Sequence, residues 1–124
     1  MKVIIAGSRN FNNYQLLADL MDIFIRSVID IEIVSGTASG ADKLGERYAK
    51  ERGYKLKRFP ADWDNYGKSA GYKRNLEMGE YADMLVAFWD GESKGTKHMI
   101  DIALSKNLDV YIVNYITKKV SKTI

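Results

Sequence analysis

The chain has 124 residues, which is enough for one domain with its own core and too few for two domains of ordinary size. Hydrophobic residues make up 46% and charged residues 28% of the chain, a composition that excludes an intrinsically disordered protein. Cysteine is absent and there is 1 histidine, so disulfides, thiol catalysis, cysteine-ligated metals and a histidine-rich metal site are not expected. The net charge of +3 is a small basic excess, which makes a nucleic-acid partner unlikely on charge alone.

The apolar segments are all shorter than the ~18–20 residues that a membrane-spanning helix needs. The first residues lack the apolar core and the small-residue cleavage site of a signal peptide. We therefore expect a cytoplasmic protein with no membrane partner.

Short β-branched segments alternate with longer amphipathic ones along the chain. Strands are expected over 2–6, 31–34, 54–59, 83–89 and 108–113, and helices over 14–28, 41–52, 68–81 and 96–106, with a loop over 62–67. This alternation predicts right-handed crossovers and a parallel sheet with helices on both faces. The expected fold is α/β, a single Rossmann-like three-layer domain over 1–116 with a mainly parallel sheet of about five strands. A basic, solvated tail is expected over 117–124.

Three loops at the expected carboxyl edge of the sheet combine glycine with small hydroxyl residues just before a helix. Glycine lets main-chain amides approach a ligand closely, and a helix N-terminus attracts anions. The residues expected to contact a ligand are Gly7, Ser8 and Arg9 after the first strand, Ser35, Gly36, Thr37, Gly40 and Asp42 after the second, and Trp89, Asp90, Gly91, Ser93, Gly95 and Thr96 after the fourth. None of the loops matches GxGxxG or GxxxxGK[ST], so an ordinary NAD dehydrogenase and a P-loop NTPase are disfavoured.

Arg74 and Asn75 complete the candidate set, because Arg74 shares a helix face with groups that favour burial. An inward-facing arginine has either a carboxylate partner in the protein or an anionic ligand, and both interpretations stay open. Trp63, Tyr66 and Tyr72 are expected either to pack in the core or a lid, or to stack on a base. Asp42 is either a first-turn acid of its helix or a contact for a ligand hydroxyl. His98 is expected at the surface or between helices.

Several stretches of this chain together resemble the YspA/YpsA-like branch of the SLOG superfamily, which is common in bacteria and their phages. The matching stretches are 3–9, 34–42, 72–78, 82–91 and 93–96. The resemblance implies a Rossmann-like sheet that binds a nucleotide or nucleotide-derived ligand, and several members are thought to act in stress or antiviral signalling. It also implies a homodimer, which an apolar surface around Ile23, Ile25 and Ile29 would suit.

The related LOG phosphoribohydrolases carry a PGGxGTxxE signature and an upstream arginine. Arg74 matches that arginine and Gly95-Thr96 matches the GT pair, but the position of the glutamate is occupied by Met99. Glycosidic cleavage generally requires a positioned carboxylate, and Asp101 lies about 200° away around the helix. The resemblance therefore favours binding or sensing of a nucleotide-like ligand, with no certain cofactor and no metal. Alternatives are a nucleotide N-glycosidase, in which Glu92, Asp90 or Asp42 would serve differently, and single-stranded nucleic-acid binding as in the related DprA.

Overall fold

Six strands form a single sheet in the computed structural model of the protein, which describes residues 1–123. The strands are β1 (Lys2–Gly7), β2 (Glu32–Ser35), β3 (Lys55–Arg58), β4 (Met84–Trp89), β5 (Asp109–Asn114) and β6 (Lys119–Lys122). Their order is β3-β2-β1-β4-β5-β6; the first five strands along the chain are parallel, and β6 is antiparallel to β5. From β1 the sheet extends to one side through β2 and β3 and to the other side through β4, β5 and β6. The switch in strand order therefore lies between β1 and β4.

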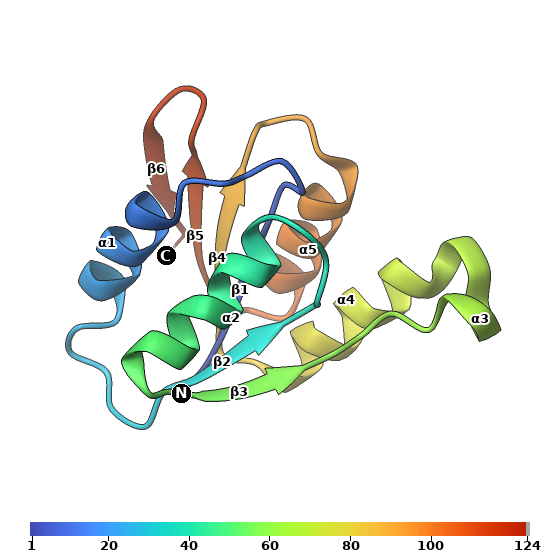
Figure 1. Ribbon diagram of the computed structural model, residues 1–124. Helices are drawn as coiled ribbons and strands as arrows, with labels where there is room; N and C mark the ends of the chain where they lie inside the picture. Colours follow the sequence, from blue (N-terminus) through green and yellow to red (C-terminus); the bar gives the residue numbers. More distant parts are fainter. Residues whose placement is uncertain (124) are drawn as a thin grey trace.

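Helices cover both faces of the sheet, as Figure 1 shows. They are α1 (Tyr14–Phe24), α2 (Ala41–Arg52), α3 (Trp63–Tyr66), α4 (Ala70–Tyr81) and α5 (Lys94–Ser105), with a 3₁₀ turn, η1 (Gly67–Ser69), between α3 and α4. One core cluster joins α1 and α2 to the sheet, and a second joins α4 and α5 to its other face. The predicted three-layer α/β architecture is therefore confirmed. No helix within residues 1–123 is long and apolar enough to cross a bilayer.

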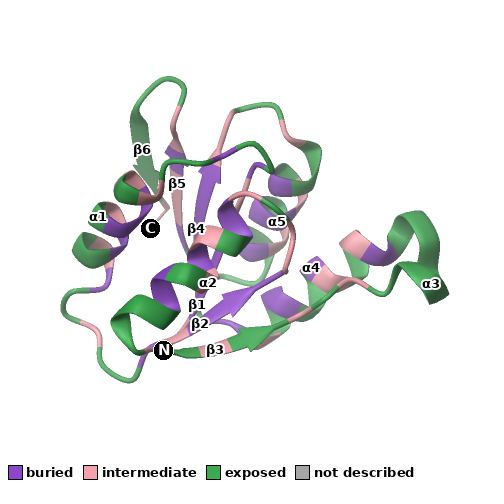
Figure 2. Ribbon diagram, in the orientation of Figure 1, coloured by how far each residue is buried: buried purple, intermediate pink, exposed green. Residues whose placement is uncertain are grey.

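The central strands are apolar at nearly every position because both of their faces are covered. In β1, Val3 and Ile5 belong to the core under α1 and α2, whereas Ile4 and Ala6 belong to the core under α4 and α5. β4 alternates in the same way between its two faces. Figure 2 shows the result, with buried residues along the middle of the sheet and exposed residues on the outer helix surfaces and on α3.

Two elements differ from the expectation in length or type. α1 ends at Phe24 and not at Val28, because the following stretch is rich in β-branched residues and turns back through Asp30, which has a φ of 56°. The expected loop over 62–67 contains α3, whose first turn is capped by the Asp62 carboxylate accepting from the Asn65 amide (3.2 Å). α3 projects from the body of the domain next to the start of α4 (Figure 1).

The basic stretch expected as a solvated tail over 117–124 is exposed, but its residues Lys119–Lys122 form strand β6. The Asn114 side chain accepts hydrogen bonds from the amides of Ile116 and Thr117, and the turn that follows pairs β6 with β5. All four β6 residues are exposed, so the strand carries no apolar alternation from which it could be predicted. Ile124 lies outside the described residues.

Close packing of helices on neighbouring elements depends on two buried glycines. A Cβ on Gly79 of α4 would lie 2.5 Å from Ile102 Cγ2 of α5, so the two helices pack closely at this position. A Cβ on Gly45 of α2 would lie 2.8 Å from Cβ of Ile5, a fully buried residue of β1. α2 can approach the sheet this closely only without a side chain at position 45.

We expect Gly45→Ala to lower the free energy of unfolding by about 1–3 kcal/mol, because overpacking against Ile5 outweighs the better helix propensity of alanine. The matched control is Gly95→Ala in α5, where an added Cβ meets no atom of residues 1–123 within 4 Å. Urea denaturation of both variants measures the difference. Equal stability of the two variants would contradict close packing of α2 on β1.

Candidate functional site

The carboxyl ends of β1, β2 and β4 meet at one edge of the sheet, and two adjoining cavities open there. The inner cavity has a volume of about 220 Å³ and extends down to Met78 and Met99, which are each 1% exposed. The outer cavity, about 370 Å³, lies between the loop after β2 and Pro60-Ala61 after β3. The structure thus brings the three loops that were expected at the carboxyl edge of the sheet to one place, although they are far apart in the sequence.

Most of the predicted site residues line these cavities. The inner cavity is lined by Gly7, Arg9, Asp42, Arg74, Asn75, Ser93, Gly95 and Thr96, and the outer cavity by Arg9, Gly36, Thr37 and Arg74. The remaining predicted residues, Ser8, Ser35, Gly40, Trp89, Asp90 and Gly91, line neither cavity. Among them, Ser8, Ser35, Trp89 and Asp90 make hydrogen bonds that hold the loops in place.

Ser8 is the main link among the three loops. Its carbonyl accepts from the amide of Ala41 (3.3 Å), at the start of α2, and its hydroxyl accepts from the amide of Asp90 (3.1 Å), after β4. Gly40 permits this approach because its φ is 77° and a Cβ there would lie 2.4 Å from the Ser8 carbonyl oxygen.

The loop from Asp90 to Ser93 is closed by its own aspartate. Asp90 Oδ1 accepts from the amides of Glu92 and Ser93, both at 2.8 Å, and these hydrogen bonds lower the pKa of Asp90. Trp89 Nε1 donates to the Ser93 carbonyl (3.1 Å). These contacts fix the residue at which α5 begins, and they leave Trp89 and Asp90 as structural supports of the site.

The loop after β2 is held from beneath by two buried side chains. The amide of Thr37 donates to Ser35 Oγ (3.0 Å), and the amide of Ala38 donates to Asp42 Oδ2 (3.1 Å). Thr37 adopts a φ of 66°, a strained value for a β-branched residue. Two amides of this glycine-rich loop are therefore already engaged within the protein.

Arg74 of α4 crosses from its helix to the loop after β2. Its Nη1 donates to the Gly36 carbonyl and its Nε donates to Asn75 Oδ1 (3.0 Å), so both observed partners are neutral. None of the ion pairs formed within residues 1–123 includes Arg74 or Arg9. Burial lowers the pKa of Arg74, the Asp42 carboxylate opposes this shift, and the charge of Arg9 adds to it. The salt-bridge interpretation of Arg74 is not supported by this part of the chain.

Asn75 joins α4 to the first turn of α5. This buried amide lies 3.4 Å from the Gly95 carbonyl, to which its Nδ2 donates, and 3.1 Å from His98 Nδ1. His98 is half-buried and makes an edge contact with the ring of Tyr72. Burial lowers the pKa of His98, so its ring is held in the neutral form. His98 therefore packs between helices, in agreement with one of the two sequence interpretations.

Asp42 is the buried titratable group of the site, at 5% exposure. Burial raises the pKa of Asp42 to about 6, against the opposing effects of the Ala38 amide and the Arg74 charge. Asp42 Oδ2 and Arg74 Nη1 both lie close to Gly36. A Cβ added to Gly36 would be 2.9 Å from Asp42 Oδ2 and 3.0 Å from Arg74 Nη1. A carboxylate and a guanidinium therefore flank one backbone position at the junction of the cavities.

Sequence reasoning missed several lining residues, some of them on α4 and α5. Lys68, Gly71, Met78 and Met99 line the inner cavity beside Trp63 and Tyr72. The helical spacing from Gly71 through Arg74 to Met78 could have identified this face of α4, and the spacing from Ser93 through Thr96 to Met99 could have identified that of α5. The position of Trp63 depends on α3, which was not expected, and Lys68 lies in η1, at the start of the expected helix over 68–81.

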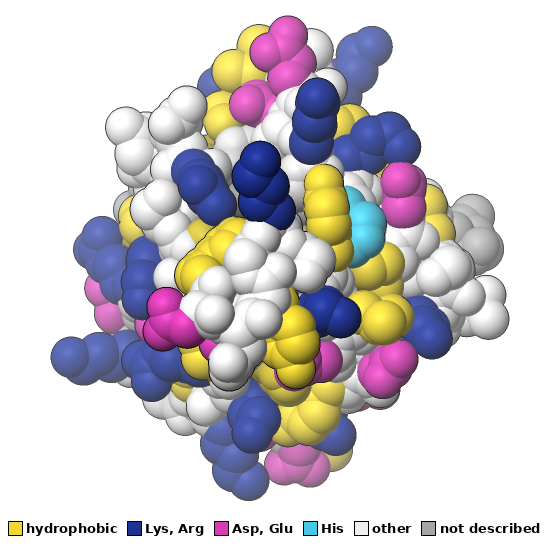
Figure 3. Space-filling view, turned by 90° about the vertical axis from the view of Figure 1, so that its right-hand side faces the viewer, with side chains coloured by type: hydrophobic (Ala, Val, Ile, Leu, Met, Phe, Trp, Pro, Cys, Tyr) yellow, Lys and Arg dark blue, Asp and Glu magenta, His cyan; other side chains and the backbone are white. Residues whose placement is uncertain are grey.

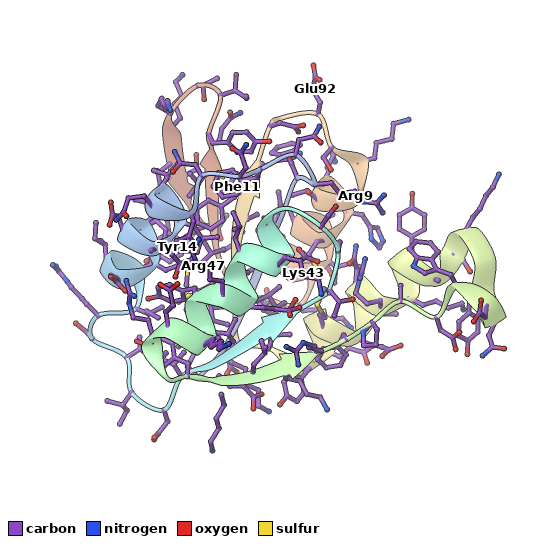
Figure 4. All side chains as sticks on the ribbon, viewed as in Figure 1. Arg9, Phe11, Tyr14, Lys43, Arg47 and Glu92 are labelled. Carbon is purple, nitrogen blue, oxygen red and sulfur yellow. The ribbon has the colours of Figure 1, made fainter. Side chains whose placement is uncertain are left out.

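Three basic side chains, Arg9, Lys68 and Arg74, and one acidic side chain, Asp42, line the inner cavity. Figure 3 looks onto this side of the molecule and shows the histidine beside hydrophobic side chains, with Lys and Arg side chains distributed around them. In Figure 4, Glu92 points away from the body of the domain at the tip of its loop, and it lines neither cavity. Within residues 1–123, no group of three or more His, Asp or Glu side chains is placed to hold a metal ion.

Comparison with known proteins gives three findings. The model of the YspA, cpYpsA-related SLOG family (YAcAr) matches residues 1–66. The Gene 61 protein of Mycobacterium phage D29 is 35% identical over 116 residues, covering 88% of this chain and 93% of that protein. The X-ray structure of DNA processing protein A (DprA) from Streptococcus pneumoniae is similar with a TM-score of 0.71 at 19% identity, over 90% of this chain. This chain matches 49% of that DprA chain, about half its length, and the likeness concerns the fold.

The raised pKa of Asp42 means that the stability of the protein should depend on pH. Between about pH 4 and pH 6 the unfolded chain loses the Asp42 proton while the folded protein keeps it, so this group lowers stability as the pH rises through that range. We expect Asp42→Asn to raise the free energy of unfolding by about 2–3 kcal/mol at pH 7.5, and therefore to unfold at a higher temperature than the wild type. At pH 4 the two proteins should unfold at the same temperature. Calorimetric melting at both pH values measures this, with exposed Asp109→Asn as the control. A gain that does not depend on pH would contradict the assignment.

Proposed function

Because the chain belongs to the YspA, cpYpsA-related SLOG family, we propose that it binds a nucleotide or nucleotide-derived molecule at the carboxyl edge of the sheet. The observation that carries the proposal is the state of Arg74. This half-buried cation donates to the neutral Gly36 carbonyl and Asn75 amide and has no ion-pair partner within residues 1–123. Buried charges are normally paired, so an anionic ligand is the natural partner.

A second cation strengthens the argument. Arg9 lines both cavities together with Arg74, and their mutual repulsion contributes to the lowered pKa of Arg74. A phosphate between them would relieve this repulsion and accept several charge-assisted hydrogen bonds. The nearby Asp42 carboxylate compensates the two charges only in part, because a single negative charge faces two guanidinium groups.

The first turn of α5 supplies the neutral donors for the same phosphate. α5 begins at Lys94 without a side-chain cap from residues 1–123, and Gly95 leaves open space on the cavity side. The first amides of a helix have no partner within it and carry partial positive charge. This position suits a phosphate better than the loop after β2, where the amides of Thr37 and Ala38 donate internally and Asp42 is acidic.

The remaining lining residues suit a sugar and a base. The Asp42 carboxylate can accept hydrogen bonds from ribose hydroxyls, as acidic residues do in other nucleotide-binding sheets. Trp63 and Tyr72 provide aromatic surfaces at the mouth of the inner cavity, and both are about half exposed, with room for a stacked ring. These features support stacking as the role of the two aromatic side chains.

We favour binding over cleavage of the glycosidic bond. Met99 occupies the position of the LOG glutamate, is 1% exposed and lines the inner cavity, so this part of the wall is apolar. Glu92 points away from the cavities, and the Asp90 carboxylate is occupied by two amides of its own loop (Figure 4). Asp42 is the only carboxylate among residues 1–123 that lines either cavity.

Single-stranded nucleic acid is a second candidate ligand. Two features favour it: the likeness of the fold to DNA processing protein A, and the exposed side chains of Trp63, Tyr66 and Tyr72 beside the Lys and Arg side chains of this surface.

We also propose that the protein acts in the cytoplasm, as a homodimer, in bacterial or phage stress or defence signalling. Size-exclusion chromatography with light scattering tests the homodimer.

The role of Arg74 is tested with Arg74→Ala. We expect this variant to lose at least about tenfold in affinity for the best ligand of a nucleotide panel, because the central phosphate contact is removed. The melting temperature of the ligand-free protein should change little, because Arg74 forms no ion pair within residues 1–123. Isothermal titration calorimetry measures the affinity, and Arg26→Ala, at an exposed position after α1, is the matched control. The absence of any ligand tighter than millimolar would contradict the proposal.

Incubation with AMP, GMP and NAD tests cleavage directly. We expect no release of free base, because the wall that would carry the catalytic carboxylate is formed by Met99. Chromatography of the reaction mixture is the measurement. Base release that is abolished by Asp42→Asn would establish the N-glycosidase alternative.

A further inference from the structure

The two cavities are lobes of one groove, because they share part of their lining. Arg9, Ala38, Trp63 and Arg74 line both of them. The inner lobe, about 220 Å³, is smaller than the roughly 300–1,000 Å³ typical of ligand pockets, and the outer lobe, about 370 Å³, is near the lower limit. A ligand of ordinary size therefore extends through both lobes.

The cations of the groove lie where the lobes meet. Arg9 and Arg74, neither of which forms an ion pair within residues 1–123, belong to the shared lining, so the strongest attraction for an anion is at the middle of the groove. The α5 N-terminus faces the same region from the inner lobe. A ligand held by these groups carries its negative charge at its centre.

Each lobe beyond the arginines offers surfaces for an uncharged ring-bearing group. The inner lobe presents Tyr72, Met78 and Met99, with Asn75 and Thr96 as polar contacts. The outer lobe presents Pro60, Ala61 and the hydroxyls of Thr37 and Ser39. Trp63, which lines both lobes, can cover a ring in either one.

We propose that the ligand is a small dinucleotide, in which one phosphate or pyrophosphate bridges two nucleoside groups, one in each lobe. This inference rests on the proposed function and specifies the ligand class. A nucleotide with a terminal phosphate would place its charge at the arginines and leave one lobe unfilled.

A strand of nucleic acid has the same local chemistry, a bridging phosphate with a nucleoside on each side. The inner lobe, however, ends against Met78 and Met99, both 1% exposed and packed in the core beneath α4 and α5. A longer strand would have to leave the groove at this closed end. The geometry therefore favours a molecule that terminates there.

The test uses the full chain and compares AMP, ADP and P¹,P²-di(adenosine-5′) pyrophosphate, with their guanosine counterparts, by isothermal titration calorimetry. ADP carries the same two phosphates as the dinucleotide, so the comparison isolates the second nucleoside. We expect the dinucleotide of at least one base to bind about tenfold or more tightly than the corresponding mono- and diphosphate. A decathymidylate that binds more tightly per site than every dinucleotide would overturn the small-molecule class.

Two variants fill the outer lobe without changing the inner one. Ala61→Trp and the more exposed Ser39→Trp should each reduce dinucleotide affinity to that of the mononucleotide while leaving AMP and GMP affinity unchanged. Ser27→Trp, at an exposed position after α1 and in neither lobe, is the control for bulk, and circular dichroism verifies folding. Mononucleotides that bind as tightly as dinucleotides, with no effect of either variant, would overturn this inference and leave the proposed function intact. Failure of every probe to bind would overturn both.

Discussion

The hydrogen bonds of Ser8 are the constraint on which the site depends. Its amide donates to the Phe88 carbonyl of β4, its carbonyl accepts from the start of α2, and its hydroxyl accepts from the loop after β4. Parallel strands bring three loops to one edge of the sheet, and contacts of this kind fix the positions of the loops relative to one another. With Ser8 2% exposed, water cannot compete for these partners, and the cavity walls keep a defined spacing.

The site carries features that are unfavourable for stability and have no evident role in folding. Asp42 is buried with a raised pKa, Thr37 has a strained φ, and Arg74 is half-buried without an ion pair in the described part of the chain. Strain and buried charge of this kind persist where the surrounding structure holds them, and they gather at functional sites. Two continuous cores on either side of the sheet provide that support here. Asp42 and Arg74 both lie beside Gly36, which precedes Thr37 and lines the outer lobe.

The layered fold could be predicted because its signals are local and repeated. The apolar residues of β1 and β4 and the amphipathic spacing of the helices each indicate the same α/β alternation. β6 could not be predicted, since its pairing comes from the Asn114 turn and not from its own side chains. α3 depends on one capping aspartate within a polar segment.

The sequence could predict that Arg9 and Gly95 line a cavity, because both lie on expected loops at the carboxyl edge of the sheet. It could not predict which groups within the loops are already engaged by the protein itself. The loop from Gly36 to Gly40 resembles a phosphate-binding loop in sequence. However, the Ser35 hydroxyl and the Asp42 carboxylate already accept hydrogen bonds from two of its backbone amides. The acceptor to which a backbone amide donates depends on how nearby side chains are oriented. The spacing of residues along the sequence does not reveal this orientation. The same holds for Met78 and Met99, apolar residues whose position at the end of a cavity follows only from the packing of α4 against α5.

Asn75 connects the two sources of positive potential in the groove. Its carbonyl oxygen accepts from Arg74 Nε, and its amide nitrogen donates to the carbonyl of Gly95 at the start of α5. Arg74 and the N-terminus of α5 are therefore both hydrogen-bonded to the same buried side chain, Asn75. The distance between them is set in the ligand-free protein. Preorganisation of this kind reduces the ordering penalty of binding, because neither group must be fixed anew by the ligand. A bridging phosphate, which has fewer free oxygens than a terminal one, benefits most, since its few contacts must all be made in one orientation. For the ligand class proposed above, the buried amide lets a small domain with a net charge of +3 rely on geometry more than on total charge.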